Sequence, residues 1–341
     1  MRRNVDPYII TRVHGLRTHL ITPDTLQILV KSKSLKDVSD NLMKTDYAPD
    51  VGQIPTQEQD AISLEDIFYK KLVERFFFLR SVSQGKMKEL LTRYCARFEV
   101  EDIKRVIRAK HGGQPEEQPH LIPIPREHSL VNFPALLQAK DVDEAVSLLR
   151  DTPYNVLHEG LQTYREIGAT IILEAALDKV YFTRLWALVG RMLGMRNLVA
   201  EEIDLRNLLI AFSMKIREAS SRTIEEALIP FSYAISKATV HSLLQNRLEE
   251  APNILTGSYS KLAAEATKLL LSDSSAPLES LLLRQLYTDA SSTLKAHSLQ
   301  PGYVVAYLLL CEFEAKNLVS IVTGKQLNLS VEEISKELFV V

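Results

Sequence analysis

Two short stretches of the chain combine acids with an amide at a spacing that could bind a cation. Their residues are Glu202, Asp204 and Asn207 in the stretch EIDLRN, and Glu312, Glu314 and Asn317 in the stretch EFEAKN. Carboxylate and amide oxygens are the ligands that hard cations such as Ca²⁺ prefer. Each stretch therefore offers part of a metal site. The alternative is a polar seam between packed helices.

Helical geometry favours the structural alternative. Side chains three or four residues apart share a helix face, whereas those two apart do not. Glu202 therefore diverges from Asp204, while Asp204 and Asn207 lie together at the border of an apolar arc. A metal site needs several converging ligands, often including His, and neither stretch has a His nearby. We expect no metal, and we interpret the Asp204–Asn207 pair and its C-terminal counterpart as partly buried groups that hydrogen-bond backbone or basic groups of an adjacent helix. Contact with a partner protein is the remaining alternative.

The elements that must position these residues are helices. Only 12 Gly and 14 Pro occur among 341 residues, and apolar residues recur at spacings of three and four. Capping sequences mark helix starts at Ser63, Thr223 and Ser330, each followed by acidic residues. No stretch shows the sustained alternation of a β-strand bounded by hairpin turns. The sequence predicts an all-α protein.

The acid-containing stretch occurs three times. Upstream, EVEDIK supplies Glu99, Glu101 and Lys104 as a first copy, and the copies lie 103 and 110 residues apart. Residues 26–47 also align without gaps on residues 133–154, with a degenerate third copy from about Phe231. The sequence predicts three helical repeat units, at 1–110, 130–219 and 220–341. A linker with four prolines and two glycines lies at 111–129.

Composition excludes several classes of protein. The net charge is −2, and Cys95 and Cys311 are the only cysteines, so we expect neither a nucleic-acid partner nor a disulfide framework. No apolar run approaches the ~20 residues that span a bilayer, which predicts a soluble, cytoplasmic protein. Phosphate-loop, HExxH and GxSxG motifs are absent from the sequence, so we expect no catalytic residue and no cofactor. Such a chain is typical of a connector or scaffold.

One aromatic run stands out. Phe76, Phe77 and Phe78 are consecutive, and three adjacent rings on a helix cannot all face one core. We expect at least one of them to meet another unit or a partner.

The repeated stretch also carries a resemblance. From Glu312 to Ile334 the chain resembles the end of the C subunit of archaeal A-type (V/A-type) ATP synthases, the counterpart of the d subunit in eukaryotic vacuolar ATPases. An acid, a Lys-Asn-Leu core, Gly-Lys and Leu-x-x-Glu-Glu-Ile follow in the family's order, with Asn328 where the family usually has Gly. Residues 202–209 resemble the family's middle copy. Residues 11–20 resemble its first helix, which usually carries two arginines, here Arg12 and Arg17. Lys104 departs from the Asn that is frequent in the first copy.

This resemblance implies a fold and a role. It implies three similar helical bundles around a pseudo-threefold axis, which form a funnel that is monomeric when isolated. One end would sit on the membrane rotor ring at the cytoplasmic face of the cell membrane, and the hollow would receive the central shaft. The protein would be a non-catalytic rotor coupling, with Arg12 and Arg17 as candidate partner-binding residues. The alternative is a helical scaffold with unrelated partners. The choice between proton and sodium belongs to the ring.

Overall fold

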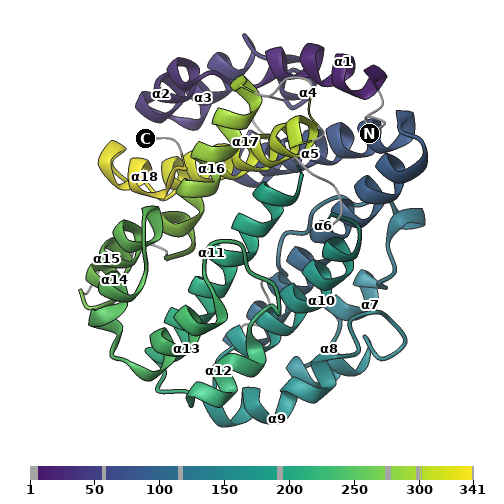
Figure 1. Cartoon of the computed structure of the whole chain (residues 1–341). Coiled ribbons are helices and arrows are strands. Elements are labelled where there is room, and N and C mark those ends of the chain that lie inside the picture. The colour runs from purple at the N-terminus through teal and green to yellow at the C-terminus, as the bar shows by residue number, and fades with distance from the viewer. Residues whose placement is uncertain are drawn as a thin grey trace. The chain divides into compact units, whose positions relative to one another are not determined.

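The computed structural model describes residues 7–55, 59–113, 118–189, 195–272, 278–296, 300 and 302–339. Within these ranges every regular element is a helix (Figure 1), which confirms the predicted all-α class. Residues 114–117 of the predicted linker lie outside the described part. The α-helices are α1 (Pro7–Leu16), α2 (Pro23–Lys31), α3 (Leu35–Leu42), α4 (Ala48–Val51), α5 (Ala61–Val82), α6 (Gly85–Gly112), α7 (Phe133–Leu137), α8 (Val142–Ser147), α9 (Leu157–Ile167), α10 (Ile171–Val189), α11 (Arg196–Lys215), α12 (Ser221–Ala227), α13 (Lys237–Gln245), α14 (Ala251–Ile254), α15 (Ser258–Leu270), α16 (Leu278–Ala296), α17 (Gly302–Gln326) and α18 (Val331–Glu337). Short 3-10 helices are η1 (Arg17–His19), η3 (Arg126–His128) and η4 (Leu248–Glu250).

Side-chain caps fix where several helices begin. Ser330 caps α18 in a capping box with Glu333, as the sequence predicts. The other two predicted caps are wrong by three residues. Asp60 caps α5 and accepts the Ser63 N–H, and Ser220 caps α12 and accepts the Thr223 N–H. Both upstream residues are strong N-caps in their own right, so each helix starts one turn earlier than predicted.

The chain divides into two compact units. Unit 1 comprises Met1–Leu91, Met192–Leu198 and Ser275–Val341, and unit 2 comprises Thr92–Arg191 and Val199–Ser274. The predicted division into three repeat units remains a prediction.

Unit 1 is built around α17. This helix packs against α5 and α16, and it also contacts α1, α3 and α18 (Figure 1). Its apolar stretch from Tyr303 to Cys311 is buried throughout and forms the core of the unit. The first and last helices of the chain therefore share one hydrophobic core.

Unit 2 contains the middle of the chain. In this unit α9 packs against α10 and α14 against α15, and α12 contacts both α10 and α13. Residues from α6 and α11, among them Phe98 and Phe212, contribute to the buried core. Within this unit a buried ion pair joins Arg97 on α6 to Glu202 on α11.

The three helices that carry the acid-containing stretches end alike. Each is followed by a residue with positive φ: Gly113 (φ 66°), Glu218 (φ 57°) and Asn328 (φ 56°). After α17 the Leu329 N–H donates to the Gly324 carbonyl (2.9 Å) and the Asn328 N–H to the Lys325 carbonyl (3.2 Å), which is a Schellman cap. Gly adopts this conformation without strain and Asn tolerates it. Asn328 thus adopts the left-handed conformation at the position where the resemblance implies Gly.

Candidate functional site: three buried carboxylate nodes

Three buried carboxylates each bind the backbone of a segment elsewhere in the chain. We call such a carboxylate, together with the groups that donate to it, a node. Glu99 on α6 forms the first. Its Oε1 accepts the Leu130 N–H and the Ser129 hydroxyl (2.8 Å), and its Oε2 accepts the Tyr154 hydroxyl (2.8 Å). The Glu99 node therefore fixes the start of α7 and the segment before α9 onto α6.

Asp204 on α11 forms the second node. Its carboxylate accepts three successive backbone N–H groups, from Tyr233 (3.0 Å), Ala234 (2.7 Å) and Ile235 (3.3 Å). The Tyr259 hydroxyl lies 3.4 Å from the same carboxylate. Burial raises the pKa of Asp204, although the backbone hydrogen bonds oppose this shift. The node holds the loop before α13 and the first turn of α15 against α11.

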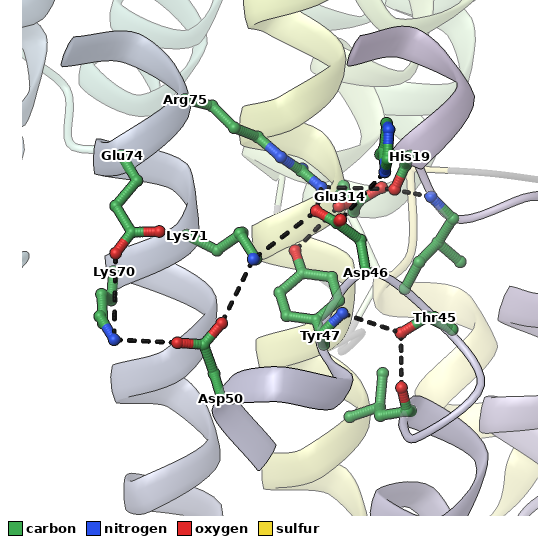
Figure 2. A network of polar contacts seen from close by, with 12 residues as sticks. His19, Thr45, Asp46, Tyr47, Asp50, Lys70, Lys71, Glu74, Arg75 and Glu314 are labelled. Atoms are coloured by element: carbon green, nitrogen blue, oxygen red, sulfur yellow. Dashed lines mark hydrogen bonds and ion pairs between the residues drawn. The ribbon is translucent and has the colours of Figure 1, made fainter. Parts of the chain in front are cut away.

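Glu314 on α17 forms the third node, which Figure 2 shows. It accepts the Ile21 N–H (2.5 Å), the Tyr47 hydroxyl (2.8 Å) and the Arg75 Nη1 proton (2.7 Å). Burial, the largest single effect, would lower the pKa of Arg75, but the attraction of Glu314 together with the smaller effects of Cys311 and Tyr47 outweighs it, so the pKa is raised and the guanidinium stays charged. Burial, followed by the charge of Glu314, raises the pKa of Tyr47. This node joins the N-terminal segments of the chain to α17.

A second layer of charges surrounds the Glu314 node. Asp46 accepts from Arg75 Nη2 (3.3 Å) and from the His19 ring (3.0 Å), and it lies 3.6 Å from Lys71 Nζ. Asp50 continues the network with Lys71 (3.2 Å) (Figure 2). Lys71 and Arg75 on α5 thereby hold Asp46, just before α4, and Asp50, within α4, in place.

Three residues after each node carboxylate lies another acceptor. Asp102 accepts the Ile122 N–H at both oxygens (3.0 and 3.2 Å), and Asn207 accepts the Ile229 N–H (2.8 Å). The third member, Asn317, accepts the Phe339 N–H (2.9 Å). Burial raises the pKa of Asp102 to about 7, against the opposing effects of Ile122 and Arg105. Two amides and one acid therefore perform the same backbone contact.

A lysine lies eleven residues after each node carboxylate. Lys110 donates to the Leu137 carbonyl (2.7 Å). Lys215 donates to the carbonyls of Leu244 (3.0 Å) and Asn246 (2.7 Å). Burial lowers the pKa of Lys215 and of Lys325, the third member. In unit 2 these lysines bind the carbonyls at the ends of α7 and α13.

In the first copy, the acid that makes the node contacts lies two positions before the acid that the sequence alignment pairs with Asp204. Glu99, not Glu101, makes the contacts of Asp204, so the nodes are spaced 105 and 110 residues apart. Glu101 instead lies near Arg105 (3.9 Å) and Arg108 (3.7 Å). The other aligned residues form ion pairs: Lys104 with Asp178 (2.6 Å), Glu202 with Arg97, and Glu312 with Lys316 (3.2 Å). A tyrosine 55 residues after the carboxylate could have identified this alignment. Tyr154 follows Glu99 at that distance, and Tyr259 follows Asp204.

The structure separates the two arginines of the first helix. Arg17 Nη1 donates to the Leu294 carbonyl (3.4 Å), so this side chain turns toward α16 of its own unit. Arg12 Nε donates to the Tyr8 hydroxyl (2.8 Å), and the side chain lines a surface pocket with Phe78. Their partner-binding role remains a prediction.

The nodes hold protein groups in place. The oxygens of Glu99, Asp204 and Glu314 accept from backbone N–H groups, hydroxyls or a guanidinium, and these are contacts that order chain segments. Among the residues that the structure describes, no group of three or more His, Cys, Asp or Glu side chains is arranged to hold a metal ion. Across the same ranges, no helix is both long enough and apolar enough to cross a membrane.

Comparison with known proteins gives the family. The sequence model of the ATP synthase (C/AC39) subunit family matches residues 9–337. The A-type ATP synthase C subunit of Methanocaldococcus jannaschii is 27% identical, with 96% of this chain and 84% of that protein covered. The proteins of the same name from Archaeoglobus fulgidus and Halorubrum lacusprofundi are 23% and 25% identical over 98% of this chain. The family match spans all three nodes, and the chain therefore belongs to the ATP synthase (C/AC39) subunit family.

Proposed function

We propose that the chain couples the central shaft of an A/V-type ATP synthase to its membrane rotor ring. As a member of the ATP synthase (C/AC39) subunit family, it is a non-catalytic subunit of that complex. The observation that carries the proposal is the family match from residue 9 to residue 337, which covers nearly the whole chain. In this role the protein transmits torque between ATP synthesis or hydrolysis and ion transport, as a peripheral protein at the cytoplasmic face of the cell membrane.

The nodes supply the stiffness that such a coupling needs. Helices α6 and α17 have 28 and 25 residues, which corresponds to roughly 40 Å each at 1.5 Å per residue. A long helix transmits force only if the segments packed on it do not slide. Buried carboxylates that bind several groups at once resist sliding, because any displacement leaves a buried polar group without its partner.

The recurrence of the nodes supports a threefold architecture. Node carboxylates, the acceptors three residues later, the lysines eleven residues later and the left-handed residues fourteen later all follow spacings of 105 and 110 residues. We therefore propose three similar helical bundles around a pseudo-threefold axis that form a funnel, with ring and shaft subunits as partners. The Glu99 and Asp204 nodes each bind a long helix to segments that follow it, whereas the Glu314 node binds α17 to segments that precede it in the chain.

Purification of the tagged chain from its own cells tests the proposed function. Membranes are solubilised in a mild detergent, and the proteins that co-purify are identified by mass spectrometry. We expect the ring and shaft subunits of the ATP synthase in fixed proportion to the tagged chain. A stable complex that contains neither would contradict the rotor role. ATP hydrolysis by the isolated chain would contradict the non-catalytic role.

A further inference from the structure

A surface pocket beside α1 contains a guanidinium that no acid of the described chain neutralises. The pocket has a volume of about 380 Å³ and is lined by Tyr8, Thr11, Arg12, Gly15, Leu16, His19 and Phe78. All of these residues belong to unit 1. Other arginines do have carboxylate partners within the described residues, namely Arg75, Arg97, Arg105, Arg108, Arg165 and Arg222. Arg75 and Arg97 also lie over tyrosine rings, but Arg12 differs from them because its contacts within the described residues are with Tyr8 and Phe78 and include no carboxylate.

The pocket holds Arg12 in a defined orientation. Its Nε donates to the Tyr8 hydroxyl (2.8 Å), and its guanidinium carbon lies 5.0 Å from the Tyr8 ring centre and 6.0 Å from that of Phe78. Cation–π contacts of this kind fix the plane of the guanidinium. With Nε engaged, the two terminal nitrogens Nη1 and Nη2 form the fork that binds both oxygens of a carboxylate. The Arg12 side chain is therefore already ordered in the unbound protein, so that binding a partner costs less conformational entropy.

The walls of the pocket are apolar and exposed. Tyr8 is 46% exposed and Phe78 is 38% exposed, although both are large hydrophobic residues. Phe78 is the ring of the Phe76–Phe78 run that turns outward, while Phe76 is buried in the core. Exposed aromatic side chains around a charged group are typical of a protein interface, where Arg and Tyr supply much of the binding energy.

The available donors indicate a carboxylate more than a phosphate. The Thr11 hydroxyl already donates to the Pro7 carbonyl (3.0 Å), and the His19 ring is bound to Asp46 (3.0 Å). One guanidinium fork then remains, which matches the two oxygens and single charge of a carboxylate. A phosphate carries more charge and more acceptor oxygens than this fork can satisfy.

We propose that the Arg12 pocket binds an Asp or Glu side chain, flanked by an apolar residue, from another protein subunit of the complex. The carboxylate pairs with Nη1 and Nη2 of Arg12, and the neighbouring apolar side chain covers Tyr8 and Phe78. This inference rests on the proposed function, since it takes the partner to be a subunit of the rotary ATP synthase. It gives Arg12 and Arg17 different roles, because Arg17 binds a carbonyl of its own unit.

The test compares full-length tagged variants in the co-purification described above. Arg12→Gln removes both the charge and the two-nitrogen fork, whereas Arg12→Lys keeps the charge but removes the fork. Arg222→Gln, which removes an exposed arginine of unit 2, is the matched control. Loss of a charge-assisted contact weakens binding by about ten- to a hundredfold. We expect that loss for Arg12→Gln, a partial loss for Arg12→Lys and none for Arg222→Gln. Binding by the unaltered chain should weaken with salt.

Photo-cross-linking identifies the occupant. A benzophenone amino acid replaces the exposed Thr11 in the full chain, and cross-linked products are mapped by mass spectrometry. A cross-link to an acidic segment of another subunit supports the inference. Cross-links to lipid alone, or unchanged binding by Arg12→Gln, overturn it while the rotor role stands. If the unaltered chain fails to purify with ring or shaft subunits, the proposed function fails instead.

Discussion

Replacement of Asp102 by asparagine should stabilise the protein at alkaline pH. Asp102 is buried and performs with a carboxyl group the backbone contact that Asn207 and Asn317 perform with neutral amides. Its pKa rises from 3.8 to about 7 on folding, mainly through burial. A carboxyl group with a raised pKa binds its proton more tightly in the folded state, so its ionisation costs stability as the pH rises from about 4 to about 7.

The size of the expected stabilisation follows from the shift in the pKa of Asp102. About three pKa units correspond to at most about 4 kcal/mol. The asparagine avoids this cost, but it loses the charge-assisted bond from Ile122 and the weak attraction of Arg105, whose Nη1 lies 4.0 Å away. Glu99 and Glu101, which disfavour the ionised acid, no longer repel the neutral amide. We expect the free energy of unfolding to rise by about 1–3 kcal/mol at pH 8 and to change little near pH 4.

Urea denaturation of the full-length chain at a series of pH values measures this difference. Glu101→Gln is the matched control, because Glu101 is a partly exposed acid one residue away on the same helix and should change stability by less than about 0.5 kcal/mol. The reasoning would be refuted if Asp102→Asn were no more stable than the unaltered chain at pH 8. An increment of equal size at pH 4 and pH 8 would also refute it, since ionisation would then play no part.

Three further substitutions test the nodes and the helix ends by the same denaturation measurement. Glu314→Gln should lower stability by about 3–5 kcal/mol, because it leaves the buried guanidinium of Arg75 without its anion; a loss below about 1 kcal/mol would show that the pair is dispensable. Gly324→Ala should cost about 1–3 kcal/mol, because the new Cβ would lie 2.6 Å from Ile334 Cγ1, and a neutral result would mean that α18 moves away freely. Glu218→Gly should add about 0.5–1 kcal/mol by relieving the left-handed backbone at φ 57°, whereas Glu218→Ala should add nothing.

The sequence predicts the helical class and the nature of the acid–amide pairs from local chemistry. Spacing places Asp204 and Asn207 on one helix face, and both bind backbone groups. The predicted partner, an adjacent helix, is wrong, because these backbone groups lie in the non-helical segment between α12 and α13. The register of the first copy is harder to read, because Glu99 and Glu101 are both acids on one helix. Burial distinguishes them: Glu99 is 3% exposed, whereas the Glu101 side chain is 28% exposed. An acceptor three residues later identifies the correct acid, since Asp102 follows Glu99 at the distance at which Asn207 follows Asp204.

The pairing of distant segments could not be read from periodicity. A hydrophobic pattern shows which face of a helix is buried, but not which segment covers it. Nothing in the α17 sequence indicates that Glu314 meets Ile21, Tyr47 and Arg75, because these residues belong to the opposite end of the chain. The predicted helix starts at Ser63 and Thr223 fail for a simpler reason, since a second capping residue lies three positions upstream of each.

The Glu314 node has a consequence for how the protein is made. The unit 2 nodes close over short stretches, since Tyr154 and Tyr259 leave the ribosome 55 residues after their carboxylates. Arg75, by contrast, precedes Glu314 by 239 residues. At about 5–20 residues per second, its anion arrives on the order of ten seconds or more later. We expect α1 to α5 to remain incompletely packed during synthesis, as natural clients for chaperones, until α17 is made and completes their core.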